Sequence, residues 1–163
     1  MGTIKYVPPI GNIGGILISA RDGAITELYF NGGRTTPETL QESLPSPADA
    51  HVLNTLSQEL DAYFAGKLKA FTVPLRPQGT PFRMGVWQAL QTIPYGETIS
   101  YKELALRIGN PAAIRAVGGA NHHNPISIII PCHRVIGANG KLVGYGGGIE
   151  VKEFLLDLEQ KYM

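Results

Sequence analysis

Residues 100–117 read SYKELALRIGNPAAIRAV and carry the start and stop signals of two short helices. Ser100, followed three residues later by Glu103, matches the capping box that begins a helix. Gly109 ends this helix, and Asn110 with the proline after it begins a second helix at once, which runs to the end of the stretch. Two short helices across a tight turn are typical of a helix-turn-helix, although two helices packed in a core give the same pattern.

The rest of the second half predicts two more helices and one strand. Thr80 and Pro81 begin a helix before the pair, and a last helix begins near Glu150. Residues 126–130 read ISIII, and three consecutive isoleucines favour a buried strand that ends at Pro131. The helix at Thr80 has one apolar stripe, made of Phe82, Val86, Trp87, Leu90 and Ile93.

The first half predicts a small mixed α/β unit. Residues 15–20 and 25–30 are apolar and β-branched, and the turn signal between them favours a hairpin. A helix with Ser46 at its N-cap follows, and Gly66 ends it. Residues 72–81 hold three prolines and one glycine, which is typical of a linker.

These elements predict an α/β (α+β) fold in two domains. Residues 1–75 would form the mixed α/β N-terminal domain, and residues 76–163 a mostly helical domain with a winged-helix-like helix-turn-helix. The chain is 44% hydrophobic and 17% charged, which is too apolar for disorder. It has no apolar run near the roughly 20 residues that a membrane helix needs. The first five residues lack the layout of a signal peptide, so we expect an intracellular location.

The charge is distributed unevenly. The chain has 14 Lys and Arg against 13 Asp and Glu, a net charge of +1 that argues against gross nucleic-acid binding. Residues 98–148 nevertheless hold five Lys and Arg against one Glu. A local basic field can steer an anionic partner such as DNA, although an ordinary solvated face has the same composition.

The single cysteine excludes an internal disulfide and any metal site built from several cysteines. Cys132 lies between Pro131 and His133, and Arg134 comes next. A lone cysteine is usually a small buried hydrophobe, but a neighbouring His or Arg can stabilise the nucleophilic thiolate. Because adjacent side chains of a strand point in opposite directions, the backbone must turn here if His133 activates Cys132.

The segment from Pro131 to Val135 resembles the active-site motif of the O6-alkylguanine-DNA alkyltransferases, also called methylated-DNA–protein-cysteine methyltransferases. The resemblance covers about residues 79–160, in order and with compatible spacing, whereas residues 1–75 match only the general α/β character of that family's variable N-terminal domain. The other matching segments are Pro81-Phe82, Val86-Trp87, Ile93-Pro94-Tyr95-Gly96, Tyr101, Arg115-Ala116-Val117-Gly118, Asn124-Pro125, Gly144-Tyr145 and Lys152-Glu153.

The resemblance implies DNA repair by direct damage reversal. The protein would transfer a methyl or larger alkyl group from O6 of guanine, and also from O4 of thymine, to Cys132, irreversibly and once per molecule. His133, through a water molecule, would take the thiol proton, Glu159 would orient the imidazole, and Asn124 would hold the turn that carries Cys132.

The resemblance also assigns residues to the DNA and to the substrate pocket. Arg115 would fill the space of the base flipped out of the duplex, and Tyr101 would donate a proton or hydrogen bond to the departing guanine. Ala116 and Gly118 would allow close approach to the minor groove. The pocket would be formed by Tyr145, by the backbone of Val143 and Gly146, and by Pro131 beside the nucleophile.

The resemblance further implies which ligands the protein needs. Its partner would be double-stranded DNA with an alkylated guanine, with no cofactor, no metal, no membrane and no obligate protein partner. We expect a monomer, cytoplasmic in a bacterium or archaeon and nuclear in a eukaryote. Gly146 stands where some relatives have serine, which suggests tolerance of alkyl groups larger than methyl.

Three other functions remain open at this point. A non-enzymatic lesion sensor of the alkyltransferase-like kind shares the fold but lacks the cysteine, which disfavours it here. A Cys-His hydrolase would need an oxyanion hole and would leave the helix-turn-helix unused. A transcription factor with a structural cysteine would leave the surroundings of Cys132 unexplained.

Overall fold

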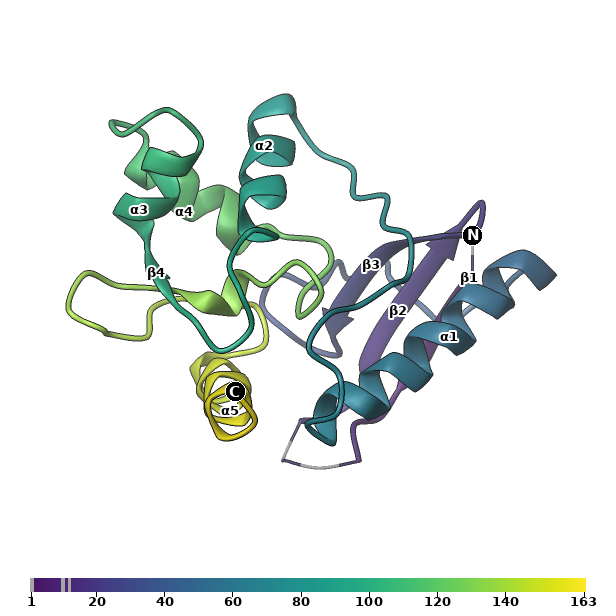
Figure 1. Ribbon diagram of the computed structural model, residues 1–163. Helices are drawn as coiled ribbons and strands as arrows, with labels where there is room; N and C mark the ends of the chain where they lie inside the picture. The colour runs from purple at the N-terminus through teal and green to yellow at the C-terminus, as the bar shows by residue number, and fades with distance from the viewer. Residues whose placement is uncertain (1, 10, 12) are drawn as a thin grey trace.

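The computed structural model describes residues 2–9, 11 and 13–163 (Figure 1). In the first half, strands β1 (Gly2–Tyr6), β2 (Ile16–Arg21) and β3 (Ala24–Phe30) form an antiparallel sheet in that order. The predicted β2–β3 hairpin is confirmed. Its turn residues Asp22 and Gly23 both have positive φ, 51° and 77°, as a type I′ turn requires.

Helix α1 (Pro47–Phe64) lies across the sheet, as Figure 1 shows. Ser46 is its N-cap, as predicted, and accepts a hydrogen bond from the backbone N of Asp49. The residues that α1 turns toward the sheet include Leu53, Leu56 and Leu60, whose side chains are buried. The apolar pattern of this helix therefore decides which of its faces covers the sheet.

The second half is mostly helical. It contains, in chain order, α2 (Pro81–Leu90), β4 (Ile99–Ser100), α3 (Tyr101–Arg107), α4 (Ile114–His122), the 3-10 helix η1 (Cys132–Arg134), β5 (Val135–Ile136) and α5 (Ile149–Lys161). Thr80 and Ser100 cap α2 and α3 through their side chains, as predicted. Strands β4 and β5 pair in parallel over two residues, which joins the end of η1 to the start of α3.

The predicted start of the second helix of the helix-turn-helix is wrong. Helix α4 begins at Ile114, after a turn in which the N of Ala113 donates to the O of Asn110 at 3.0 Å. The helix also continues past Val117 to His122, through two glycines that cost about 1 kcal/mol each in a helix. Ala120, one turn beyond Val117, is buried, and this burial favours the longer helix.

The predicted strand at residues 126–130 is also wrong. The segment forms turns, and Ile128 has a φ of +72°, which a strand does not allow. Only Ile126 makes a strand-like bridge, to Leu28 at the edge of β3. Ile126, Ile128 and Ile130 are buried as expected, and Ile129 is partly buried, so tertiary packing of a short apolar run outweighed its β propensity.

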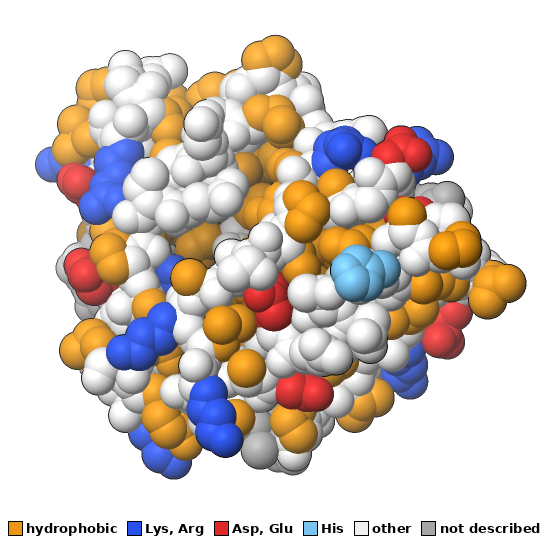
Figure 2. Space-filling view, turned by 45° about the vertical axis from the view of Figure 1, so that its right-hand side comes forward, with side chains coloured by type: hydrophobic (Ala, Val, Ile, Leu, Met, Phe, Trp, Pro, Cys, Tyr) orange, Lys and Arg blue, Asp and Glu red, His pale blue; other side chains and the backbone are white. Residues whose placement is uncertain are grey.

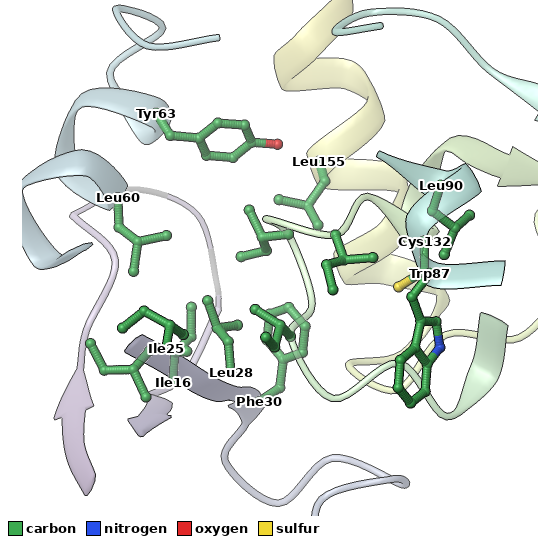
Figure 3. Close-up of a cluster of buried hydrophobic side chains, with 14 of the residues drawn as sticks. Ile16, Ile25, Leu28, Phe30, Leu60, Tyr63, Trp87, Leu90, Cys132 and Leu155 are labelled. Atoms are coloured by element: carbon green, nitrogen blue, oxygen red, sulfur yellow. The ribbon is translucent and has the colours of Figure 1, made fainter. Parts of the chain in front are cut away.

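Buried side chains from both halves form one hydrophobic core. Figure 3 shows Ile16 and Leu28 of the sheet and Leu60 of α1 in the same cluster as Trp87, Cys132 and Leu155. Phe82, predicted to face inward on α2, is 38% exposed. No helix within the described part of the chain is both long and apolar enough to cross a bilayer.

Candidate active site

The backbone around Cys132 leaves the extended conformation. Cys132, His133 and Arg134 form η1, and the N of Cys132 donates to the O of Ile130 at 2.8 Å. Successive side chains of a 3-10 helix are about 120° apart, so Cys132 and His133 do not point in opposite directions. The turn that the sequence required is therefore present.

Glu159 on α5 is the acceptor at the centre of the site. Its Oε2 lies 2.6 Å from Nε2 of His133, and its Oε1 lies 2.8 Å from Nε of Arg134. The N of Gly96 also donates to Oε1, at 3.2 Å. Glu159 is 1% exposed and His133 is 0% exposed, so these charges interact with little solvent screening.

The surroundings fix the protonation of both partners. Burial opposes the ionisation of Glu159, but His133 and Arg134 outweigh it and hold the pKa of this carboxyl well below its usual range. Burial is the largest effect on His133 and lowers its pKa, although Glu159 acts in the opposite direction. A neutral imidazole beside a carboxylate donates its single N–H to the carboxylate, which places the proton on Nε2 and the lone pair on Nδ1.

Nδ1 of His133 is buried and has no hydrogen-bond partner among residues 2–9, 11 and 13–163. Burial raises the pKa of the Cys132 thiol, while Asn124, Lys152 and Ser127 act to lower it. Cys132 is only 4% exposed. The resting site thus pairs a protonated thiol with a base whose lone pair is not used by any described residue.

Lys152 on α5, which belongs to one of the segments that resemble the family, is completely buried. Its Nζ donates to the O of Val135 at 2.6 Å and to the O of Val143 at 3.1 Å. Burial lowers the pKa of Lys152 to about 8, and the charge of Cys132 partly opposes this shift. The signal in the sequence was a lysine between the apolar positions Val151 and Leu155.

Two asparagines hold the backbone that carries the cysteine. The side chain of Asn124 donates to the O of Ile130 at 2.7 Å and accepts from the N of Ile126 at 3.0 Å. These bonds close residues 124–130 into a loop that ends directly before η1. Asn121 on α4 donates to the O of Cys132 at 3.4 Å, so α4 contacts the backbone of Cys132.

Tyr101 and Tyr145 both lie at the site. The hydroxyl of Tyr101 donates to the O of Val143 at 3.4 Å, and the side chain is partly exposed. Tyr145 is 4% exposed and packs against Phe30 with ring centroids 5.6 Å apart. Both phenols have a raised pKa because of burial and the neighbouring Cys132.

A cavity of about 310 Å³ opens beside Tyr145, and it is lined by Arg34, Gly144, Tyr145, Gly148, Ile149 and Glu150. Pro131 lines a different hollow, together with Arg134 and Tyr95. The structure therefore places Pro131 at the start of η1 and not on the wall of the cavity beside Tyr145.

The space beside Gly146 is occupied. A Cβ at this position would collide with Oγ1 of Thr35, and the N of Arg34 donates to the O of Gly146 at 2.9 Å. Because Gly146 has no side chain, the loop after β3 can pack against it. This glycine therefore does not by itself enlarge the cavity beside Tyr145.

The residues assigned to DNA lie on an outer face. Arg115 and Ala116 are exposed in the first turn of α4, and Gly118 lies beneath Tyr101 at ordinary contact distance for a Cβ. On the face drawn in Figure 2, basic and acidic side chains are dispersed among apolar ones, and some of them lie next to one another. None of the described residues forms a cluster of three or more His, Cys, Asp and Glu that could hold a metal ion.

Comparison with known proteins agrees with this geometry over both halves. Residues 81–161 match the DNA-binding domain of 6-O-methylguanine DNA methyltransferase, and residues 9–77 match its ribonuclease-like domain. The chain belongs to the 6-O-methylguanine DNA methyltransferase family. The predicted fold class is confirmed by this match and by the structural neighbours below.

Three relatives in this family show how far the likeness extends. The methylated-DNA–protein-cysteine methyltransferase of Methanosarcina acetivorans is 50% identical over 90% of this chain and 92% of its own. That of Mycolicibacterium paratuberculosis is 46% identical over 98% and 94%. The crystal structure of Mycobacterium tuberculosis OGT in complex with DNA is 48% identical over 98% of this chain and 92% of its own, with a TM-score of 0.83.

Proposed function

We propose that this protein repairs double-stranded DNA by moving an alkyl group from O6 of guanine to the sulfur of Cys132. It is a methylated-DNA–protein-cysteine methyltransferase, as its relatives are named. The observation that carries the assignment to these residues is the buried Cys132 next to a neutral His133 whose tautomer Glu159 fixes. This arrangement supports nucleophilic attack by a thiolate made at the moment of reaction.

The transfer is a displacement at carbon. Nδ1 of His133 takes the thiol proton, directly or through one water molecule, and the sulfur attacks the alkyl carbon. The new C–S bond forms as the bond from carbon to O6 breaks, and its electron pair leaves with the guanine. Tyr101 donates a proton or hydrogen bond to the departing base, which leaves as neutral guanine once it is protonated.

Buried charges stabilise the intermediate protonation states. Protonated His133 lies against the Glu159 carboxylate, so the imidazolium keeps a hydrogen-bonded counter-charge. Lys152 places a positive charge near the sulfur and favours the thiolate. The product is a thioether, which has no ionisable S–H, so each molecule reacts once.

The flipped base reaches the thiol from the face of α4. Arg115, exposed in the first turn of that helix, fills the space that the base leaves. Ala116 and Gly118 allow the helix to approach the minor groove closely. Tyr145 stacks on the base, and the backbone of Val143 and Gly146 forms hydrogen bonds with the edge of the base. O4-alkylthymine is a second substrate of the same pocket.

We further propose that the protein acts as a monomer in the compartment that holds the chromosome, where thiols are kept reduced. Residues 1–75 and 76–163 are its two domains, of which the second carries the chemistry. The lesion-sensor alternative is disfavoured because Cys132 and its base are both present.

The stoichiometry of repair tests the proposal. Duplex DNA with one O6-methylguanine is mixed with a sub-stoichiometric amount of protein, and restored guanine is counted by digestion and chromatography. We expect the yield to stop at one guanine per protein molecule, with no yield from Cys132→Ser. Continued turnover, or repair by the serine variant, would contradict the proposal.

A further inference from the structure

Glu159 receives a hydrogen bond from the other half of the chain, and the mechanism above does not use it. The hydroxyl of Tyr63, near the end of α1, donates to Oε2 of Glu159 at 2.7 Å. Both side chains are at most 1% exposed. Figure 3 shows Tyr63 extending from α1 with its oxygen directed toward α5, the helix of Leu155.

We propose that Tyr63 is a positioning residue that limits the basicity of His133 through the carboxylate oxygen that they share. The inference rests on the proposed role of His133 as the base, and it adds a residue of α1 to the reaction.

One oxygen of Glu159 accepts hydrogen bonds from three donors. Oε2 of Glu159 accepts from Nε2 of His133, from Nη2 of Arg134 at 3.0 Å and from the hydroxyl of Tyr63. Each donor withdraws negative charge from this oxygen. The more charge Tyr63 withdraws, the less Glu159 stabilises the imidazolium form of His133, so the hydroxyl favours the neutral, reactive imidazole.

Three aromatic rings surround the ring of Tyr63, whose hydroxyl is directed at Glu159. The centroid of the Tyr63 ring lies 5.3 Å from that of Phe64, 5.5 Å from that of Phe71 and 6.3 Å from that of Tyr95. Burial and the charge of Glu159 raise the pKa of Tyr63 well above its usual range, so the phenol keeps its proton and remains a donor.

The other titratable groups near the His133–Glu159 pair either carry a charge or make no hydrogen bond to the Glu159 carboxylate. Arg134 comes from η1, Lys152 from α5, Tyr145 from the loop before α5 and Tyr95 from the segment after α2. The two tyrosines interact with Glu159 only through space. Tyr63→Phe therefore removes one hydrogen bond from Glu159 without changing a formal charge or the shape of the ring.

The test is the pH dependence of the single-turnover rate of methyl transfer from duplex O6-methylguanine. In Tyr63→Phe we expect the midpoint of the acidic limb to rise by about one pH unit, since a hydrogen bond to a charged group is worth on the order of one such unit. Tyr95→Phe is the matched control, and its midpoint should equal that of the wild type.

An unchanged midpoint in Tyr63→Phe would overturn the inference, even if the variant melts at a lower temperature, because a purely structural role moves stability alone. Glu159→Gln is measured in parallel, because it distinguishes a failure of the proposed role of the His133–Glu159 pair from a failure of the inference about Tyr63. If Glu159→Gln reacts at the wild-type rate, the proposed role of the His133–Glu159 pair fails and the inference fails with it. If Glu159→Gln is slow and the Tyr63→Phe midpoint is unchanged, only the inference fails.

Discussion

The sheet with α1 and the region from α4 to α5 bury different kinds of polar side chain. In the first, the buried polar side chains of the strands are neutral hydroxyls, such as Thr3 and Ser19, whose oxygens lie 2.8 Å apart, and the buried carboxylate of Asp49 on α1 accepts from the N of Gly23 in the hairpin turn. In the second, His133, Arg134, Lys152 and Glu159 are all buried within one chain segment. Burying a charge costs desolvation free energy, and a buried ion pair is weak evidence for stability. The concentration of charged side chains around Cys132 therefore indicates a role in the reaction.

The bond from Tyr63 to Glu159 is the exception that joins the two regions. It shows that the fold does not separate a structural half from a reactive half completely. The predictions below test the contrast, because changes in the charged region should affect both reaction and stability, whereas changes within the sheet should affect neither strongly.

The largest effect is expected from Glu159→Gln. The amide cannot balance Arg134 or hold His133 in the reactive tautomer, so we expect the transfer rate to fall roughly 100-fold or more and the free energy of unfolding by about 3 kcal/mol. Single-turnover kinetics and urea unfolding measure the two. Glu153→Gln, exposed on the same helix, is the control and should match the wild type; a wild-type rate in Glu159→Gln would remove the charged cluster from the chemistry.

Arg115→Ala should lower repair in duplex DNA by roughly tenfold or more, since nothing then replaces the flipped base in the stack. Repair of the same lesion in single-stranded DNA should change much less, because no stacked partner has to be displaced. Arg21→Ala, exposed at the end of β2, is the matched loss of one charge from the sheet. Equal losses in the two arginine variants would mean that charge alone, and not the place of Arg115, matters.

Acid should destabilise the charged region before the sheet. His133 has a lowered pKa in the folded protein, so below about pH 6.5 the unfolded chain binds a proton that the folded chain does not. Stability should therefore fall as the pH decreases through this range, by up to about 1.4 kcal/mol per pH unit for one such group. His122 shifts in the same direction but is exposed and contributes less. Denaturant unfolding at several pH values measures the slope, and a flat curve between pH 6.5 and 5 would contradict it.

The smallest effect is expected from the double substitution Thr3→Val and Ser19→Ala. It removes both members of a buried hydrogen bond, and Glu27, which also contacts Ser19, is partly exposed and can bind water instead, so stability should change by less than about 1 kcal/mol. The transfer rate should not change. A large loss of activity would show that the sheet contributes to the reaction by more than the contact of α1 with Glu159.

The sequence predicted those elements whose signals are local. Ser46, Thr80 and Ser100 cap helices as expected because an N-cap needs only its own side chain and the next three residues. The strand predicted at residues 126–130 failed for two reasons. The side chain of Asn124 bonds the backbone of Ile126 and Ile130, a local contact that the apolar pattern does not reveal, and Ile126 pairs with Leu28 of β3, which is distant in sequence. Strand β1 was missed because its pairing with β2 decides its conformation.

The same distinction applies to the site. Cys132 and His133 are neighbours in the sequence, so their chemistry could be predicted, and the resemblance supplied Glu159. Tyr63 lies among the buried apolar residues of α1, and no sequence pattern links it to a carboxylate 96 positions away. Buried polar partners from distant segments are visible only once the chain is folded.

The most direct test of the central claim locates the transferred group. The protein is reacted with duplex DNA that carries a deuterium-labelled O6-methylguanine, digested, and sequenced by tandem mass spectrometry. The account predicts one labelled methyl group on the peptide that contains residues 131–134, attached to the sulfur of Cys132, and none elsewhere. A labelled methyl on another residue, or repaired DNA with an unlabelled protein, would contradict it.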